Sequence, residues 1–361
     1  MNQSNPLIVN ETPVKTSKNF KINNLVLDEF EMPQVKPFNG MKLTIPDTKR
    51  CKPYEEELSL EGGMGEIFLR QSKEEHNISL ELTIPEGMDV ATPVELVFPF
   101  TKENITLVDT IVIHGGKDSK AQIILKYFVE DGVDLSTYEA YRNSVLKGDV
   151  EAGAELNVTV VNSLSNGISS FYSNELSVSE QARVTMNYID FGSKHSVVNM
   201  RTTLARKEGH SHMNVIYIGI DEQILDYNLI TVLEGEQTVG NIEVQGVVDD
   251  YARKSFKGTL DFKRGATQSV GYENEYCIML ADTPTSLSLP MLLCEEEDVE
   301  GNHSCASGKV DDKVMFYIQS RGISEEEARK LIVKANFHAI LQSVQDKDTR
   351  EEIIQEIDRR L

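Results

Sequence analysis

A histidine and a cysteine stand two positions apart near the C-terminal end of the sequence, in the stretch EGNHSCASGK. On a β-strand, residues i and i+2 point to the same side, so His303 and Cys305 would share one face. Imidazole and thiolate together suit metals such as iron and zinc. Cys294 lies nine residues before His303, across the acidic turn EEEDVE, and is a third candidate ligand. The sequence therefore offers these three residues as a candidate metal site.

Each residue type also has an ordinary structural interpretation. A lone cysteine is most often a small buried apolar residue, and a lone histidine most often has a local partner or lies on the surface. Cys51 and Cys277 are interpreted as core thiols, and Cys277 sits in the apolar run EYCIML. His210 and His212 form a second i, i+2 pair, but no thiol or carboxylate stands at a matching separation. We interpret that pair as a solvated strand face.

The sequence shows no motif of a catalytic apparatus. It contains no GxSxG nucleophile elbow, no P-loop, no GxGxxG opening a helix and no HExxH. Asp249, Asp250 and Asp261 leave a carbohydrate-active enzyme open, because a β-helix can carry catalytic carboxylates on its side. We therefore expect a protein without enzyme activity, with a carbohydrate-active β-helix enzyme or a purely structural interaction solenoid as alternatives.

The composition indicates an acidic globular protein. Lys and Arg total 36 against 58 Asp and Glu, a formal net charge of −22, which repels phosphate backbones and anionic lipid surfaces. We expect neither a nucleic-acid nor a membrane partner. The first twenty residues lack the apolar core of a signal peptide, and no run of about 18 apolar residues follows. The four cysteines are sparse and form no CxxC pair, so we predict a cytoplasmic protein in a reducing compartment.

Strand-like runs rich in Val, Ile, Thr, Tyr and Phe follow one another from Gly62 to about Cys294, without amphipathic helices between them. Small-residue turns precede several runs at spacings of 28, 28, 26 and 30 residues, marked by Gly153, Gln181, Gly209, Gly235 and Gly265. Such a repeat indicates a solenoid of stacked coils. We favour a parallel β-helix over a Greek-key sandwich, which should show more hairpin turns. The segment STYEAYRNSVLKGD fits either a helix or a strand.

The hydrophobic period changes from two to about 3.6 residues near Asp311. Ser324 and Glu327 form a predicted capping box, followed by one apolar helix face consisting of Ala328, Leu331, Ile332 and Ala335. Asp348 with Glu351 predicts the start of another helix, which carries Ile353, Ile354, Ile357 and Leu361.

This C-terminal helical module must cover its apolar stripe. It either caps the open end of the β-helix or docks a partner subunit, and the pattern leaves both open. The chain thus divides into an irregular region with a few short strands at 1–60, a β-helix core at 61–308 and a helical module at 309–361.

The stretch PMLLCEEEDVEGNHSCASGKVDDKVMFYIQSRGISEEEARKLIVKANF resembles the C-terminal signature of the SufB/SufD family, the core scaffold proteins of the SUF iron–sulfur cluster assembly machinery. The matching features include Pro290 before a strand, His303 followed by small residues, Phe316-Tyr317 and, above all, Ser320-Arg321-Gly322-Ile323 followed by Glu325-Glu326-Glu327-Ala328. The resemblance covers the chain from about residue 60 onward. It implies a right-handed parallel β-helix flanked by helical regions.

The resemblance also implies partners and a cargo. An ATPase of the ABC type, SufC, would bind the C-terminal helical module, where we expect contacts from Phe316, Tyr317, Arg321, Gly322, Glu325 and Leu331. ATP would enter only through that partner. A SufB-like and a SufD-like protomer pair through their β-helices, and a transient iron–sulfur cluster forms near their interface. The cluster is held by a cysteine on the SufB-like side and a histidine on the SufD-like side, and it is not expected in the isolated chain.

Individual positions favour the SufD type. His303 matches the family histidine, whereas a SufB-like chain has a cysteine where Pro284 stands and a glutamate where Ser304 stands. SufD-like chains often carry a cysteine two residues before the histidine, where this chain has Gly301. Cys305, two residues after it, is a hypothetical substitute on the same strand face. We expect a non-enzymatic scaffold subunit that works with a SufC-like ATPase and with a SufB-like protomer or a second copy of itself.

Overall fold

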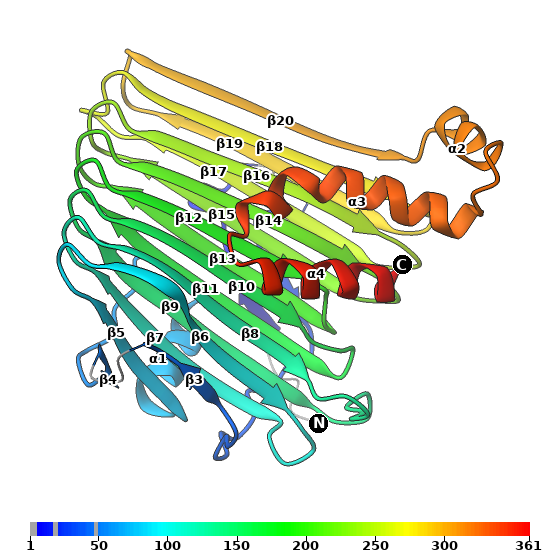
Figure 1. Cartoon of the computed structure of the whole chain (residues 1–361), viewed down its shortest axis with the longest axis horizontal. Helices are drawn as coiled ribbons and strands as arrows, with labels where there is room; N and C mark the ends of the chain where they lie inside the picture. Colours follow the sequence, from blue (N-terminus) through cyan, green and yellow to red (C-terminus); the bar gives the residue numbers. More distant parts are fainter. Residues whose placement is uncertain (1–5, 17–20, 47–49) are drawn as a thin grey trace.

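The computed structural model describes residues 6–16, 21–46 and 50–361. Two long sheets of parallel strands lie face to face, and the chain alternates between them (Figure 1). The odd-strand sheet contains β5 (Ile78–Ile84), β7 (Thr106–Gly115), β9 (Ala140–Val150), β11 (Ile168–Val178), β13 (His195–Leu204), β15 (Ile224–Leu233), β17 (Arg253–Phe262) and β19 (Thr285–Cys294). The even-strand sheet contains β6 (Asp89–Phe100), β8 (Lys120–Val129), β10 (Glu155–Ser163), β12 (Arg183–Asp190), β14 (His210–Gly219), β16 (Val239–Val248), β18 (Ser269–Met279) and β20 (Val299–Lys309).

The core lies between the two sheets, because every second side chain of each strand points inward. Register partners on successive strands form continuous apolar rows, such as the buried row Val158, Met186, Met213 and Ile242. Stacking such rows over about eight coils buries one core along the whole solenoid. The predicted parallel β-helix is therefore confirmed, and the ambiguous segment STYEAYRNSVLKGD contributes strand β9.

One corner of the coil repeats a residue in the left-handed conformation. Its members, each with positive φ, are Asp118, Gly153, Gln181, Glu208, Gln237 and Gln268. Their N–H groups donate to carbonyls in the following coil, on Ala152, Glu180, Lys207, Glu236, Thr267 and Asp298. Three of the five markers taken from the sequence, Gly209, Gly235 and Gly265, lie within three residues of this corner rather than on it. Glycine does not mark this corner reliably, because backbone hydrogen bonds to the following coil hold glutamine and glutamate in the left-handed conformation as well.

The N-terminal part of the chain covers the odd-strand sheet and pairs with the first strand of each sheet. Strands β3 (Lys42–Thr44) and β4 (Cys51–Pro53) pair antiparallel with β6 and β5. Strands β1 (Leu7–Val9) and β2 (Leu25–Leu27) form a small ribbon, and helix α1 (Glu66–Glu74) follows. A second apolar cluster attaches these elements to the sheet through Val9, Leu27, Met64, Phe68, Val108, Tyr141, Phe171 and Val197.

The C-terminal module contains α2 (Asp312–Gln319), α3 (Glu325–Ser343) and α4 (Lys347–Arg360). The predicted capping box is confirmed, since Ser324 Oγ accepts from Glu327 N and the Glu327 carboxylate accepts from Ser324 N. Helices α3 and α4 lie across the outer face of the even-strand sheet, not over the end of the solenoid (Figure 1). The module therefore covers a side of the β-helix and leaves the last coil open.

Two details of the predicted helices are wrong. Leu331 and Ala335 are exposed, because the sheet lies against the stripe formed by Ala328, Val333, Phe337, Ile340 and Leu341. Helix α4 begins one residue before Asp348, and its N-cap is Asp346, whose carboxylate accepts from Thr349 N. Ile353 and Ile357 are buried against the solenoid as expected.

Candidate functional site

Strands β19 and β20 are the edge strands of the two sheets. Most residues of β20 are exposed, whereas most residues of the strands at the middle of the solenoid are buried. An edge strand presents backbone N–H and C=O groups to which another strand can be added. The last coil is therefore open on the side that faces away from the rest of the solenoid.

The structure places His303 and Cys305 on the inward side of β20. Cys305 is half-buried and packs against the core, and the alternation of the strand puts His303 on the same side. Their register partners on β18 are Glu273 and Glu275. His303 itself is exposed, so its imidazole lies at the open end with a buried carboxyl group on the strand below it.

Glu275 is the centre of a buried polar network. Its Oε1 accepts from Lys254 Nζ at 2.6 Å and from Tyr217 OH at 3.0 Å, and its Oε2 accepts from Ser288 Oγ at 2.8 Å. Lys254 also donates to Ser288 Oγ at 3.1 Å. Both charged side chains are 0% exposed. Their charges compensate each other, which satisfies the condition for burying an ion pair.

Glu273 is also fully buried, but neither carboxylate oxygen has a hydrogen-bond partner among the described residues. The carboxyl lies against Gly258, where any Cβ atom would collide with Glu273 Oε1. Burial, assisted by the charge of Glu275, raises the pKa of Glu273 to about 8. Near neutral pH this group is mostly a neutral acid. Sequence reasoning missed it, because carboxylates in the alternating run GYENEYC look solvent-facing.

Burial raises the pKa of the Cys305 thiol to about 12, with Glu273 and Glu275 adding to the effect and Lys254 opposing it. The thiol therefore stays protonated at neutral pH, and a cation would have to displace its proton before sulfur could bind it. Cys294 is exposed at the end of β19, in the other sheet, and its Sγ donates to the Glu296 carbonyl at 2.9 Å. The structure groups His303 with Cys305 and sets Cys294 apart from them.

The other thiols and histidines are placed elsewhere. Cys277 is buried in the core and Cys51 is half-buried, and all four cysteines are free thiols. His210 and His212 lie on the outer face of β14, where burial lowers the pKa of both. Within residues 6–16, 21–46 and 50–361, no three His, Cys, Asp or Glu side chains are arranged to hold a metal ion.

The carboxylates considered for a carbohydrate-active site are already engaged. Asp249 and Asp250 lie in the turn after β16, where Asp249 Oδ1 accepts from Asp250 N at 2.9 Å and Asp250 Oδ2 accepts from Asp221 N at 3.0 Å. Asp261, on β17, pairs with Lys263 at 2.9 Å. Asp249 and Asp250 therefore stabilise a turn, and Asp261 forms an ion pair.

Helix α2 presents apolar side chains to solvent. Phe316 is 73% exposed, Tyr317 58% and, on the neighbouring α3, Leu331 50%. The Arg321 guanidinium donates to Tyr317 OH at 2.8 Å and lies 4.8 Å from the centre of its ring. Gly322, with φ of 88°, allows the turn into α3. The next helix begins at Glu325, whose carboxylate pairs with Arg329 at 2.7 Å.

Helix α2, which carries the two exposed rings, follows the end of the edge strand β20 (Figure 1). Exposed aromatic clusters of this kind typically mark protein–protein contacts. The surface contains the residues that the sequence assigned to partner binding.

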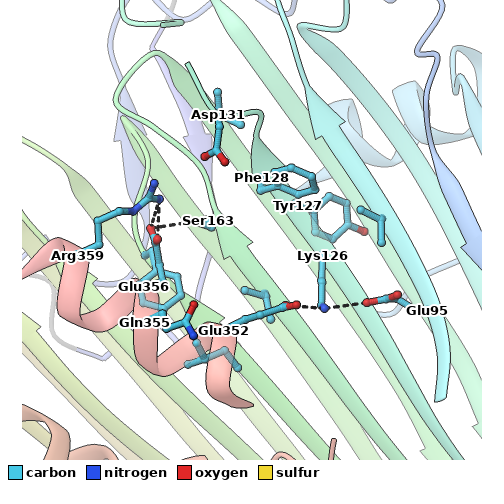
Figure 2. A pocket seen from close by; sticks show the side chains of 15 residues that line it. Glu95, Lys126, Tyr127, Phe128, Asp131, Ser163, Glu352, Gln355, Glu356 and Arg359 are labelled. Carbon is cyan, nitrogen blue, oxygen red and sulfur yellow. Dashed lines mark hydrogen bonds and ion pairs between the residues drawn. The ribbon is translucent and has the colours of Figure 1, made fainter. Parts of the chain in front are cut away.

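A groove of about 600 Å³ between α4 and the even-strand sheet was not predicted. Figure 2 shows Lys126 on β8 between two carboxylates, with Nζ 2.8 Å from Glu95 and 2.7 Å from Glu352 on α4. Glu356 accepts from Ser163 Oγ at 3.0 Å. These contacts attach α4 to the solenoid. Nothing in the sequence signals them, because the paired residues are far apart along the chain.

This chain is similar to a known family of proteins. The family model described as SUF system FeS cluster assembly, SufBD core domain, matches residues 98–336. The chain therefore belongs to the SufBD core family, and the resemblance to SufB and SufD is confirmed.

Curated relatives include SufD proteins. The iron–sulfur cluster assembly protein SufD of Bacillus subtilis is 21% identical over 281 residues, which cover 78% of this chain and 63% of that protein. An iron–sulfur cluster assembly SufBD family protein of Pyrococcus horikoshii is 23% identical over 74% of this chain and 59% of that protein. SufD of Escherichia coli is 22% identical over 53% of this chain and 45% of that protein. The matches thus span about three-fifths of the length of the first two relatives.

In the described part of the chain, no helix is both long and apolar enough to cross a membrane.

Proposed function

We propose that this chain is a non-enzymatic scaffold subunit of iron–sulfur cluster assembly, and that the nascent cluster is its cargo. The observation that supports the proposal is the position of His303, which matches the family histidine and lies exposed at the open last coil. A ligand that must be shared between two protomers has to be reachable from a second protomer. The relatives named as cluster assembly proteins support the same role.

His303 supplies the lone pair of a neutral imidazole to iron. Two carboxyl groups lie beneath it, and Glu273 is unpaired among the described residues, so the end of the solenoid can accept added positive charge. The remaining ligands come from a paired protomer, either a SufB-like chain or a second copy of this one. The edge strands β19 and β20 are the proposed pairing surface. Cys305 is a candidate additional ligand, and Cys294 is a more distant one.

The proposed energy source is a partner ATPase of the SufC type, which docks on α2 and the start of α3. ATP binds only to that partner, and closure of its subunits pulls on the C-terminal module. Because α3 and α4 pack on the outer face of the even-strand sheet, such a pull would act on the β-helix itself. We place this assembly in the cytoplasm.

The proposal is tested by His303→Ala in cells that express the chain with its partner proteins. We expect a complex of normal composition and a reduced yield of clusters on recipient proteins. His212→Ala, which removes a different histidine from the outer face of β14, is the matched control and should leave the yield unchanged. A normal cluster yield with His303→Ala would reject the ligand role.

A further inference from the structure

A pocket of about 420 Å³ lies on the outer side of the odd-strand sheet, at the first coils of the solenoid. Residues 54–58 form one wall, and the last turn of α1 contributes Ser72 and Lys73 to another. Strands β5 and β7 contribute Ser79 and Thr110, which are register partners. The pocket lies at the opposite end of the solenoid from the edge strands β19 and β20 (Figure 1). It is therefore separate from the candidate site at His303.

The hydroxyl of Thr110 is buried in this pocket without a hydrogen-bond partner. Thr110 is 2% exposed, and its Oγ1 bonds to no described residue. The neighbouring Ser79 differs, because its Oγ donates to the Tyr54 carbonyl at 3.0 Å. Buried hydroxyl groups are nearly always paired, so the unpaired one beside a cavity indicates a bound ligand atom.

The groups around Thr110 accept hydrogen bonds more readily than they donate them. His76 Nδ1 lies 3.0 Å from the Ser72 carbonyl, which can only accept, so Nδ1 carries the proton. In the neutral imidazole, Nε2 is then an acceptor. The C-terminal end of α1 adds the partial negative charge of its unpaired carbonyl groups.

The charge of the pocket is also negative. Three carboxylates, Glu55, Glu56 and Glu57, line it together with one ammonium group, that of Lys73. Lys73 Nζ lies 3.6 Å from Glu57, and within residues 6–16, 21–46 and 50–361 neither Glu55 nor Glu56 has an ion-pair partner. Burial, together with the charges of Glu56 and Glu81, raises the pKa of Tyr54. An aromatic ring beside unpaired carboxylates favours an organic cation.

We propose that this pocket binds small linear alkylamines through their primary ammonium group. An ammonium group has three N–H donors and no acceptor, which matches a pocket with an unpaired hydroxyl and unpaired carboxylates. Thr110 Oγ1 accepts one N–H, the carboxylates of Glu55 and Glu56 accept the others, and the alkyl chain packs against Tyr54 and Leu58. This binding site goes beyond the proposed function.

The choice of ligand is tested on the full chain by saturation-transfer NMR, with three probes of similar size titrated at constant ionic strength. We expect saturable binding of n-butylammonium and none of n-butanol, which lacks the charge. Tetramethylammonium, which has the charge but no N–H donor, should bind at least about tenfold more weakly. Equal binding of the two cations would reduce the site to general charge attraction and overturn the proposal. The absence of saturable n-butylammonium binding would overturn it as well.

The residues of the site are tested by substitution. Thr110→Val keeps the shape of the side chain, so the protein should unfold in urea at the wild-type midpoint or above it, while the dissociation constant of n-butylammonium rises about tenfold. Thr259→Val is the matched control, because Thr259 on β17 is also a fully buried hydroxyl without a described partner. It should leave the affinity unchanged. Equal affinity of the wild type and Thr110→Val would contradict the site.

The carboxylates give an independent readout. Glu55→Gln combined with Glu56→Gln should weaken n-butylammonium binding and reduce its dependence on sodium chloride, because two interacting charges are lost. Glu222→Gln, which changes an exposed carboxylate in a distant turn, should keep both the affinity and the salt dependence of the wild type. The same salt dependence in the double variant and the wild type would show that these carboxylates do not contact the ligand, and would overturn the assigned geometry.

Discussion

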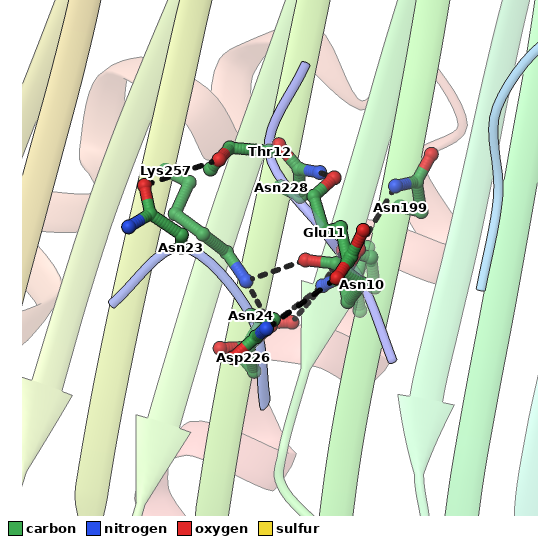
Figure 3. Close-up of polar contacts among 10 residues, drawn as sticks. Asn10, Glu11, Thr12, Asn23, Asn24, Asn199, Asp226, Asn228 and Lys257 are labelled. Atoms are coloured by element: carbon green, nitrogen blue, oxygen red, sulfur yellow. Dashed lines mark hydrogen bonds and ion pairs between the residues drawn. The ribbon is translucent and has the colours of Figure 1, made fainter. Parts of the chain in front are cut away.

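Lys257 Nζ lies 2.5 Å from Asp226 Oδ1 on the outer face of the odd-strand sheet, and both side chains are almost completely excluded from water. The N-terminal segment covers the pair, as Figure 3 shows. Asn10 Nδ2 donates to Asp226 Oδ1 at 2.6 Å, and the Asn10 carbonyl accepts from Lys257 Nζ at 2.9 Å. Asn199 Nδ2 donates to Asn10 Oδ1 at 2.8 Å. A segment more than 180 residues away in the sequence thus replaces water around an ion pair on the solenoid surface.

Lys257→Met should destabilise the protein strongly. The substitution leaves the Asp226 carboxylate buried without its cation, and breaking such a pair costs about 3–5 kcal/mol. The free energy of unfolding in urea measures the loss. Lys15→Met, which removes an exposed lysine paired with Glu11, is the control and should change stability by less than about 0.5 kcal/mol. Similar losses for the two variants would show that leaving the Asp226 carboxylate without its cation does not destabilise the folded protein.

Asn10→Ala should release the N-terminal segment before the solenoid unfolds. Removal of the amide leaves Asp226 and Asn199 short of partners, at a cost of about 1–3 kcal/mol. Limited proteolysis should then cleave the variant near residue 10 at protease concentrations that leave the wild type intact. Asn24→Ala, which changes an exposed amide in the same region, should be cleaved no faster than the wild type. Equal cleavage of all three proteins would contradict the anchoring role of Asn10.

Glu273 should make the stability depend on pH. Its folded-state pKa of about 8 lies above the usual value of 4.5, so the native state holds this proton more tightly than the unfolded state. The stabilisation is fully present below pH 4.5 and is lost as the pH rises to 8. From this group alone the loss is at most about 5 kcal/mol. Glu273→Gln stays neutral, so its stability relative to the wild type should increase between pH 4.5 and 8.

Urea unfolding at several pH values measures this difference. Glu300→Gln is the matched control, because Glu300 is an exposed carboxylate on the neighbouring strand. Its difference from the wild type should stay nearly constant over the same interval. If the difference in free energy of unfolding between Glu273→Gln and the wild type were also constant, the buried carboxyl would be ionised in the native protein. Glu273 would then not be a neutral acid beneath His303.

The β-helix was predictable because each coil repeats the same requirement, an inward row of apolar side chains such as Val158, Met186 and Met213. The alternation of apolar and polar residues along each strand makes this requirement visible in a single sequence. The cap of α3 was predictable for a similar reason, since Ser324 and Glu327 interact locally. The buried stripe of α3 was predicted only in part. Which face of a helix is covered depends on where the sheet lies, and exposed Leu331 carries no local signal of that position.

Two features of the sequence pointed to the candidate site. The i, i+2 spacing offered His303 with Cys305, and the match to a family motif singled out His303, whereas its exposure at an edge strand came from the structure. The buried carboxyl groups beneath it could not be predicted, because glutamates on a strand usually face water. Glu275 is tolerated inside because Lys254 reaches it across the interior, a contact between the two sheets. Periodicity within one strand contains no information about that distance.

The Cys305 thiol should react slowly with iodoacetamide in the native protein. Its pKa of about 12 leaves about a thousandfold less thiolate than a thiol at the ordinary value of 9.0. Mass spectrometry of the labelled peptides at pH 8 should show Cys294, which is exposed, labelled well before Cys305. In urea the two cysteines should label at similar rates. Faster native labelling at Cys305 would show an ionised thiol at the last coil.

Truncation of the exposed aromatic side chains of α2 should weaken partner binding and leave the protein folded. Phe316 and Tyr317 are more than half exposed, so Phe316→Ala combined with Tyr317→Ala removes little buried area and should change the free energy of unfolding by less than about 1 kcal/mol. Truncation of exposed aromatic anchors of an interface typically costs 2 kcal/mol or more in binding, which is about thirtyfold in the dissociation constant.

A pull-down with the proposed SufC-type ATPase measures that loss for the double variant. Val26→Ala is the control, because Val26 is a similarly exposed apolar residue on the N-terminal ribbon. Arg321→Gln should show an intermediate loss, because it leaves both rings in place but removes the hydrogen bond that orients Tyr317. Full retention of the ATPase by the double variant would exclude α2 as the docking surface, whereas loss with Val26→Ala as well would show that binding depends on general surface apolarity rather than on this helix.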